Sequence, residues 1–121
     1  LGYQIKDVDR DNNTMTTQLN VGDDHLSPSG AVHGGVISGF LDFSCGCTAI
    51  MTLDKGQLCA TVELNVKYFK PLKSGDRIYA KTKVLNRGKS LCSTIAEVYR
   101  EGDNKNIVAL STGTFNIYKP K

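Results

Sequence analysis

The sequence has no tryptophan, only two histidines among 121 residues, and no strong excess of one charge. The sequence has fifteen lysines and arginines and twelve aspartates and glutamates, which gives a formal net charge of +3. Nucleic-acid-binding domains usually carry a clustered basic stripe, and a charge this mild does not indicate one. We therefore expect no nucleic-acid partner, although the small positive excess suits an anionic small ligand.

The four cysteines do not form a metal-binding pattern. Zinc sites use CxxC pairs or clusters of cysteine and histidine at ligand spacing. Here Cys45 and Cys47 form a CxC pattern inside an apolar run, and the histidines are not spaced as their partners. With Cys59 and Cys92 the even count would allow two disulfides in three pairings. A chain of this length does not need disulfides, so we expect buried free thiols. The spacing of cysteines and histidines gives no reason to expect a metal, and no other motif indicates a bound cofactor.

A secretory signal is also missing from the first residues. Residues 1–6 read Leu-Gly-Tyr-Gln-Ile-Lys, without a basic segment followed by an apolar one. Together with free thiols, this favours a reducing, cytoplasmic location. The charged fraction of 22% and the apolar fraction of 40% are typical of a folded domain. We expect residues 1–121 to form a single domain, because the chain is too short for two ordinary ones.

The longest apolar stretch runs from residue 34 to residue 53 and holds one charged side chain, Asp42. A stretch of this length could cross a membrane. Three features oppose that interpretation: Asp42 lies near its centre, four glycines and several hydroxyl residues dilute it, and no basic flank anchors it. A helix that is apolar on every side is otherwise buried on every side. We therefore predict a central helix over residues 34–53 and no membrane partner.

The remaining segments favour β-strands. Six strands are expected, at residues 3–8, 14–21, 62–68, 78–84, 91–100 and 107–118. The third and fourth alternate between apolar and polar side chains, which is typical of half-buried strands. The last two alternate less cleanly, so their buried faces stay unassigned. The pattern predicts an α+β fold in which an antiparallel sheet wraps around one long buried helix.

Asp42 is the first candidate for chemistry. A carboxylate that is buried, ionised and unpaired costs several kcal/mol, so its position in an apolar helix needs a reason. One interpretation is that Asp42 points at solvent or caps a nearby backbone group. The other is that it serves as a nucleophile or general base in a dry cleft.

The second candidate is the start of the helix, where residues 31–35 read Ala-Val-His-Gly-Gly. The first N–H groups of a helix have no internal acceptor and carry the positive end of its dipole. Gly34 and Gly35 let a ligand approach the backbone closely, which is one way to build an oxyanion hole. Alternatively, the glycines are only a flexible helix start and His33 is a polar cap.

These two candidates lie too far apart to act together within one chain. Asp42 follows Gly34 by eight residues, which places them about 12 Å apart at roughly 1.5 Å per residue. A nucleophile and its oxyanion donors must lie within about 3 Å of one reacting carbonyl group. If both are catalytic, they act across two chains. The pattern therefore predicts a homodimer with two shared sites, in which two such helices pack antiparallel about a two-fold axis.

Together the two motifs resemble a known family. The segment HGGVI at 33–37, followed by FLD at 40–42, is similar to the hotdog-fold acyl-CoA thioesterases of the PaaI-like, phenylacetic acid degradation type. The resemblance continues through TVELNVKY at 61–68, Pro71, Gly-Asp at 75–76 and Gly-Lys-Ser at 88–90. It covers roughly residues 15 to 118, nearly the whole chain.

The resemblance implies a hotdog fold and a mechanism of thioester hydrolysis. The Gly34 N–H would bind the thioester carbonyl, and Asp42 would attack that carbonyl or activate water. His33 would hold the loop and help to polarise the carbonyl. Thr61, on the strand after the helix, would position the water or the carboxylate.

The resemblance also implies that coenzyme A enters only as part of the acyl-CoA substrate. The substrate-binding residues would be Ser27, Gly35, Arg87, Gly88, Lys89 and Ser90. The turn at 87–90 would meet the phosphates of coenzyme A, or it is only a solvated turn. Relatives often carry asparagine where Ser27 stands, and serine is shorter but can still donate a hydrogen bond. Members of the family join dimers into tetramers, so we expect a dimer of dimers.

Two other functions stay open. A hotdog dehydratase or hydratase acting on acyl thioesters needs a histidine paired with an acid, and residues 23–25, Asp-Asp-His, do not match the order of the hydratase loop. The other alternative is a hotdog protein that binds acyl-CoA without catalysis. The acyl group itself is not set, because Phe40, Phe43 and Phe69 could line a pocket for aryl or aliphatic chains.

Overall fold

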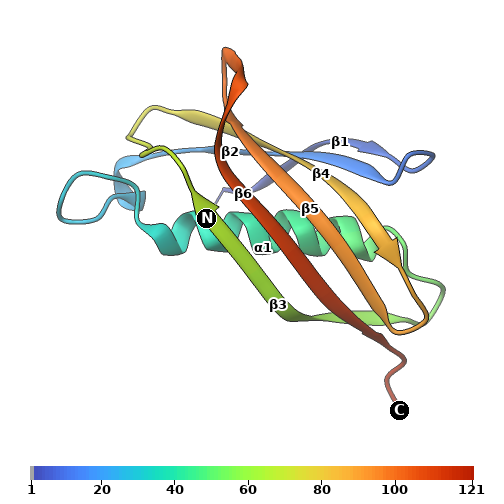
Figure 1. Cartoon of the computed structure of the whole chain (residues 1–121). Helices are drawn as coiled ribbons and strands as arrows, with labels where there is room; N and C mark the ends of the chain where they lie inside the picture. Colours follow the sequence, from blue (N-terminus) through green and yellow to red (C-terminus); the bar gives the residue numbers. More distant parts are fainter. Residues whose placement is uncertain (1) are drawn as a thin grey trace.

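The computed structural model describes residues 2–121. Its elements in chain order are β1 (Gln4–Asp9), β2 (Thr14–Asn20), a short 3₁₀ helix η1 (Asp23–His25), α1 (Gly34–Ile50), β3 (Leu58–Tyr68), β4 (Arg77–Arg87), β5 (Leu91–Arg100) and β6 (Asp103–Tyr118). The strands form one sheet in the order β1-β2-β4-β5-β6-β3, and every pairing is antiparallel. The sheet curves over one face of α1 (Figure 1). This is the predicted α+β arrangement, the hotdog fold.

The buried face of α1 follows the helical period. Its buried residues are Ile37, Phe40, Leu41, Ser44, Cys45, Thr48 and Ala49, which recur every three or four positions and face the sheet. The largest core side chains opposite them come from four strands: Leu19, Ile78, Val98 and Phe115. Because apolar contact with the sheet fixes one face of α1, the position of its other face is fixed as well.

Hydroxyl groups also tie α1 to the sheet. Ser44 Oγ donates to the carbonyl of Phe40 at 2.7 Å and lies 2.6 Å from Thr17 Oγ1 on β2. Thr48 Oγ1 lies within hydrogen-bond distance of Thr82 Oγ1 on β4. All four hydroxyl residues are buried. These bonds satisfy polar groups that would otherwise destabilise the core.

Removing the Ser44 hydroxyl is expected to destabilise the fold. Ser44 uses its proton for the Phe40 carbonyl, so Thr17 must donate to Ser44. Ser44→Ala leaves that buried donor without a partner, and we expect the free energy of unfolding to fall by about 1–3 kcal/mol. Urea denaturation at one fixed protein concentration measures the change. Adding Thr17→Val should restore part of the loss, and a Ser44→Ala chain as stable as the wild type would contradict this account.

Two features of the predicted helix are wrong. It ends at Ile50 rather than at residue 53, because Thr52 and Leu53 turn back with their N–H groups bonded to the carbonyls three residues earlier. It is also not buried on every side. The sheet covers one face only, and the other face holds half-buried residues, most of them small: Ser38, Gly39, Asp42, Phe43, Gly46 and Cys47. No helix within residues 2–121 is long and apolar enough to cross a membrane.

The strand after the helix differs most from its prediction. β3 begins at Leu58, earlier than expected, and lies at an edge of the sheet, paired with β6 alone. Its expected alternation holds in the middle, where Leu64 and Val66 are half-buried between exposed polar residues. It fails at the two ends, where Val62 is 61% exposed and Tyr68 is 51% exposed. A shift in register between Thr61 and Glu63 breaks the pleat, and an edge strand has no second neighbour to cover it. The other strands lie where predicted, with β4 and β6 longer than expected.

Candidate active site

The start of α1 presents an unused backbone donor. His33 is the N-cap, and its Nδ1 accepts a hydrogen bond from the Gly35 N–H at 3.0 Å. The Val36 N–H bonds to the His33 carbonyl at 2.9 Å. The Gly34 N–H has no acceptor among the residues that the structure describes, and Gly34 is exposed. His33 thus caps the helix, as one of the two interpretations of this segment has it, and one donor at the positive end of the helix is left for a ligand.

The cap also defines the form of the His33 side chain. Because Nδ1 accepts a hydrogen bond, the neutral imidazole carries its proton on Nε2. The backbone N–H of His33 bonds to the carbonyl of His25 at 2.8 Å. His25 is buried, and its own Nδ1 accepts the Gly22 N–H at 3.0 Å. His25 therefore supports the loop that carries His33, while His33 offers an Nε2–H donor on the surface.

Asp42, near the middle of α1, forms a hydrogen bond with Thr61 of β3. Thr61 Oγ1 donates to Asp42 Oδ1 at 2.9 Å, although the two residues are 19 positions apart. Both line a hollow of about 220 Å³ together with residues of α1, β3 and β6. Asp42 is half-buried and Thr61 is exposed. The structure thus brings together the helical acid and the strand hydroxyl.

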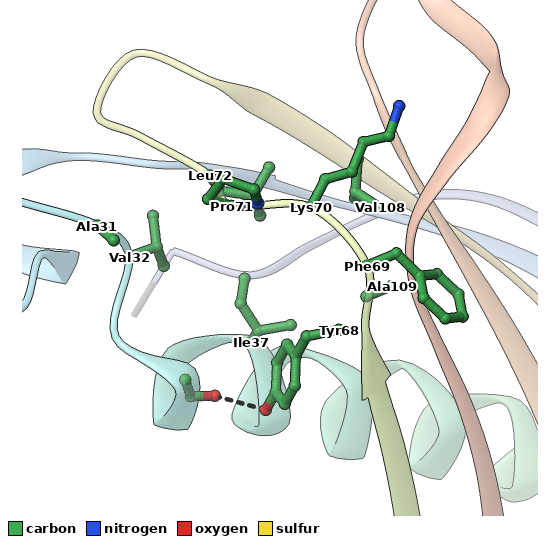
Figure 2. A pocket seen from close by; sticks show the side chains of 11 residues that line it. Ala31, Val32, Ile37, Tyr68, Phe69, Lys70, Pro71, Leu72, Val108 and Ala109 are labelled. Atoms are coloured by element: carbon green, nitrogen blue, oxygen red, sulfur yellow. Dashed lines mark hydrogen bonds between the residues drawn. The ribbon is translucent and has the colours of Figure 1, made fainter.

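A second and larger pocket lies beside Gly34. It measures about 390 Å³ and is lined by Ala31, Val32, Gly34, Ile37, Tyr68, Phe69, Lys70, Pro71, Leu72, Val108 and Ala109 (Figure 2). The lining is mostly apolar, and the side chain of Lys70 extends away from α1 (Figure 2). No residue of this pocket lines the hollow around Asp42. One chain therefore keeps Gly34 and Asp42 in separate depressions.

The three phenylalanines proposed for an acyl pocket are divided among different places. Phe69 lines the pocket beside Gly34, and Phe43 lines the hollow around Asp42. Phe40 has no exposed surface and lies in the core, with its ring 5.6 Å from that of Tyr3. The idea that Phe40 lines a pocket is therefore wrong for this chain.

The turn at 87–90 has a structural function. Arg87 Nε donates to Thr52 Oγ1 at 3.0 Å, and another guanidinium nitrogen donates to Gln57 Oε1 at 3.0 Å. These bonds tie the end of β4 to the segment that joins α1 to β3. Gly88 closes the turn with its N–H on the Leu91 carbonyl at 2.8 Å. Lys89 and Ser90 are exposed, so their side chains are the ones free to meet a ligand.

Ser27 is hydrogen-bonded to a residue of the pocket wall but does not line either depression. Its Oγ is 2.8 Å from Ser29 Oγ, and its backbone N–H bonds to the Ala31 carbonyl at 2.7 Å. It lines neither the pocket beside Gly34 nor the hollow around Asp42. A role for Ser27 in binding the carbonyl stays a prediction.

The cysteines near Asp42 are poor nucleophiles. All four are free; Cys45 and Cys92 are buried, whereas Cys47 and Cys59 are half-buried and line the hollow around Asp42. Burial raises the pKa of each thiol above its usual value. The thiols are therefore protonated at neutral pH, and only a thiolate attacks a carbonyl efficiently. Within residues 2–121, no three acidic, cysteine or histidine side chains gather in a way that could hold a metal ion.

A comparison with protein families identifies the group of proteins that carries these features. The model of the thioesterase superfamily matches residues 29–107. The chain belongs to the thioesterase superfamily. The matched range contains the helix start with Gly34, the Asp42–Thr61 pair and the turn at 87–90, and it excludes Ser27.

Curated relatives in this superfamily are distant and longer. A candidate esterase from Saccharolobus solfataricus is 32% identical over 90 residues, which cover 74% of this chain and 57% of that protein. Human acyl-coenzyme A thioesterase 13 is 27% identical over 90 residues, which cover 74% of this chain and 64% of that protein. The aligned part thus spans less than two thirds of each of these relatives.

Solved structures share the fold over nearly the whole chain. A mutant of the phenylacetic acid degradation protein PaaI from Thermus thermophilus has a TM-score of 0.83 and 25% identity, and the match covers 96% of this chain and 93% of that chain. A thioesterase from Haemophilus influenzae has a TM-score of 0.86 at 17% identity, covering 97% of this chain and 78% of that one. The resemblance to PaaI-like hotdog thioesterases is confirmed.

Proposed function

We propose that the chain is an acyl-CoA thioesterase, which hydrolyses the thioester to a free acid and coenzyme A. The observation that carries the proposal is the hydrogen-bonded pair of Asp42 and Thr61 in a hollow of its own. Membership of the thioesterase superfamily and the unused Gly34 N–H support it. The raised pKa of the Cys47 and Cys59 thiols leaves the Asp42 carboxylate, with the Thr61 hydroxyl bonded to it, as the reactive pair of that hollow.

The proposed site is shared between two chains. Gly34 of one chain and Asp42 of the other act on the same carbonyl group, because the two lie in separate depressions of one chain. The half-buried face of α1 around Asp42 is rich in small residues, which allow close packing of a second helix. β3 is an edge strand with exposed apolar side chains, including Val62 and Tyr68, which suit an interface. We propose a homodimer, joined into a dimer of dimers.

In the proposed reaction, the thioester oxygen accepts the Gly34 N–H of one chain, with the Nε2–H of His33 as a further donor. Charge that develops on that oxygen is stabilised by the positive end of α1. Asp42 of the other chain either attacks the carbonyl carbon, which gives an anhydride that water then hydrolyses to the free acid, or takes a proton from a water that attacks the carbonyl directly. Thr61 holds the Asp42 carboxylate through its hydrogen bond. The sulfur leaves as coenzyme A and takes up one proton.

The rest of the substrate has its own proposed contacts. Gly35 allows close approach at the helix start, and Ser27 adds a donor for the carbonyl. Gly88, Lys89 and Ser90 meet the phosphates of coenzyme A, for which the exposed Lys89 supplies the positive charge. Arg87 contributes less directly, because its nitrogens hold Thr52 and Gln57.

We also propose a cytoplasmic location, because four free thiols suit a reducing compartment.

Product analysis tests the function. The purified chain is incubated with short, long and aryl acyl-CoAs, and substrate and free coenzyme A are separated by chromatography, since protein thiols interfere with thiol dyes. Release of coenzyme A and free acid in equal amounts is expected. A change in unsaturation with the thioester intact would instead indicate a dehydratase or hydratase. Tight binding without turnover would indicate a non-catalytic binder.

A further inference from the structure

Tyr68 links the edge strand to the first turn of the helix. It is the last residue of β3, and its backbone is held in register opposite Ala109 of β6. Its hydroxyl donates to the carbonyl oxygen of Gly34 at 2.9 Å, and the ring forms part of the wall of the pocket beside Gly34 (Figure 2). The phenol thus reaches across from the sheet to the carbonyl of the proposed oxyanion residue, although Tyr68 is 51% exposed.

A second hydrogen bond holds the phenol in place. Ser38 Oγ lies 2.5 Å from the Tyr68 hydroxyl. The phenol has one proton, and it goes to Gly34, whose carbonyl can only accept. Ser38 must therefore donate to Tyr68, which makes a directed chain from Ser38 through Tyr68 to Gly34. Each bond in such a chain polarises the next one.

The contacts of Tyr68 and His33 meet on the same peptide group. The peptide between Gly34 and Gly35 carries the Gly34 carbonyl, which Tyr68 holds, and the Gly35 N–H, which donates to His33 Nδ1 at 3.0 Å. Two successive glycines have the widest conformational freedom of any dipeptide. The Gly34 N–H belongs to the preceding peptide, whose His33 carbonyl accepts the Val36 N–H at 2.9 Å. Both peptides that flank the Gly34 Cα are therefore held, and together they set the direction of the Gly34 N–H.

We infer that Tyr68 is a positioning residue: it holds the peptide after Gly34, and together with the His33–Val36 bond on the peptide before it, it aims the Gly34 N–H at the substrate carbonyl. The inference rests on the proposed function for its effect on catalysis. It does not require Tyr68 to touch the reacting atoms. In this role, an exposed side chain of β3 pre-organises the backbone donor. An oxyanion hole lowers the activation barrier only when its donors are pre-organised in this way.

The test is Tyr68→Phe, which keeps the ring and removes the hydroxyl. We expect kcat to fall about tenfold while KM changes less than about twofold, because a misdirected donor affects the transition state more than substrate binding. Ser38→Ala should give a smaller loss of kcat in the same direction. Tyr79→Phe is the matched control, since within residues 2–121 the Tyr79 hydroxyl makes no hydrogen bond, and it should match the wild type.

A second measurement does not depend on turnover. Amide hydrogen exchange of Gly35, followed by NMR, should be faster in Tyr68→Phe than in the wild type, because the peptide loses one of the hydrogen bonds that hold it. If the wild type hydrolyses no acyl-CoA, the proposed function fails. The exchange rate of Gly35 then still tests whether Tyr68 holds the peptide. Unchanged Gly35 exchange, an unchanged kcat in an active enzyme, or an equal loss of kcat in Tyr79→Phe would overturn the inference.

Discussion

Replacing Asp42 by asparagine is expected to lower kcat for acyl-CoA hydrolysis by about 10²–10⁴-fold, the range that a positioned acid–base group contributes. Asparagine has nearly the same shape and can still accept the hydrogen bond from Thr61, which the carboxylate accepts at 2.9 Å. It can neither attack the carbonyl nor take a proton from water. The change therefore removes the chemistry of the side chain and keeps its contacts. Steady-state kinetics on the best acyl-CoA of the panel measure the effect.

Asp54→Asn is the matched control for this variant. Asp54 is an exposed acid in the segment between α1 and β3, and it lines neither depression near the site. The same change of charge at this position should leave kcat unchanged. Equal activity of Asp42→Asn and the wild type would remove Asp42 from the mechanism.

Replacing Gly34 by proline is expected to lower kcat by about 10²–10³-fold, the loss found when one oxyanion donor is removed. Proline has no backbone N–H, and the first helical position tolerates it because that N–H has no partner inside the helix. The preceding residue must then be extended, and His33 already is, with φ −62° and ψ 131°. The variant thus deletes the proposed donor with little reason for the helix to change.

Gly34→Ala separates the loss of the donor from the addition of atoms. A Cβ at this position would lie 3.8 Å from the Tyr68 hydroxyl oxygen, which is an ordinary contact. Alanine keeps the N–H, so most of the activity should remain. Circular dichroism of both variants checks that the helix is intact. If the proline variant folds and hydrolyses acyl-CoA as fast as the wild type, the Gly34 N–H is not the oxyanion donor.

The sequence predicted the start of the helix and the separation of Gly34 from Asp42, because both depend on local rules. The glycine pair after His33 marks the helix start at Gly34, where the structure has it. The rise of a helix separates Gly34 from Asp42 whatever surrounds them, and the two do lie in separate depressions. The buried faces of β5 and β6 stayed unassigned for a physical reason. Thr94 and Ser111 point inward, so polarity does not distinguish inside from outside there.

Other features depend on contacts between distant segments, which a single sequence does not specify. Alternation along β3 indicates a strand, but it does not tell whether the strand lies in the middle or at the edge of a sheet. The edge position leaves Val62 and Tyr68 exposed. The hydrogen bonds of Arg87 to Thr52 and Gln57 were not predicted, because both partners lie about 30 residues or more away in the chain.

Mixing two inactive variants tests the central claim, that each site takes Gly34 from one chain and Asp42 from the other. Gly34→Pro and Asp42→Asn chains with different affinity tags are co-expressed, and kcat of the mixture is compared with that of each variant alone. Random pairing makes half of the dimers mixed, and each mixed dimer has one intact site of two, so about a quarter of wild-type activity should return. If the mixed dimers form and remain as inactive as the separate variants, the site does not combine residues of two chains.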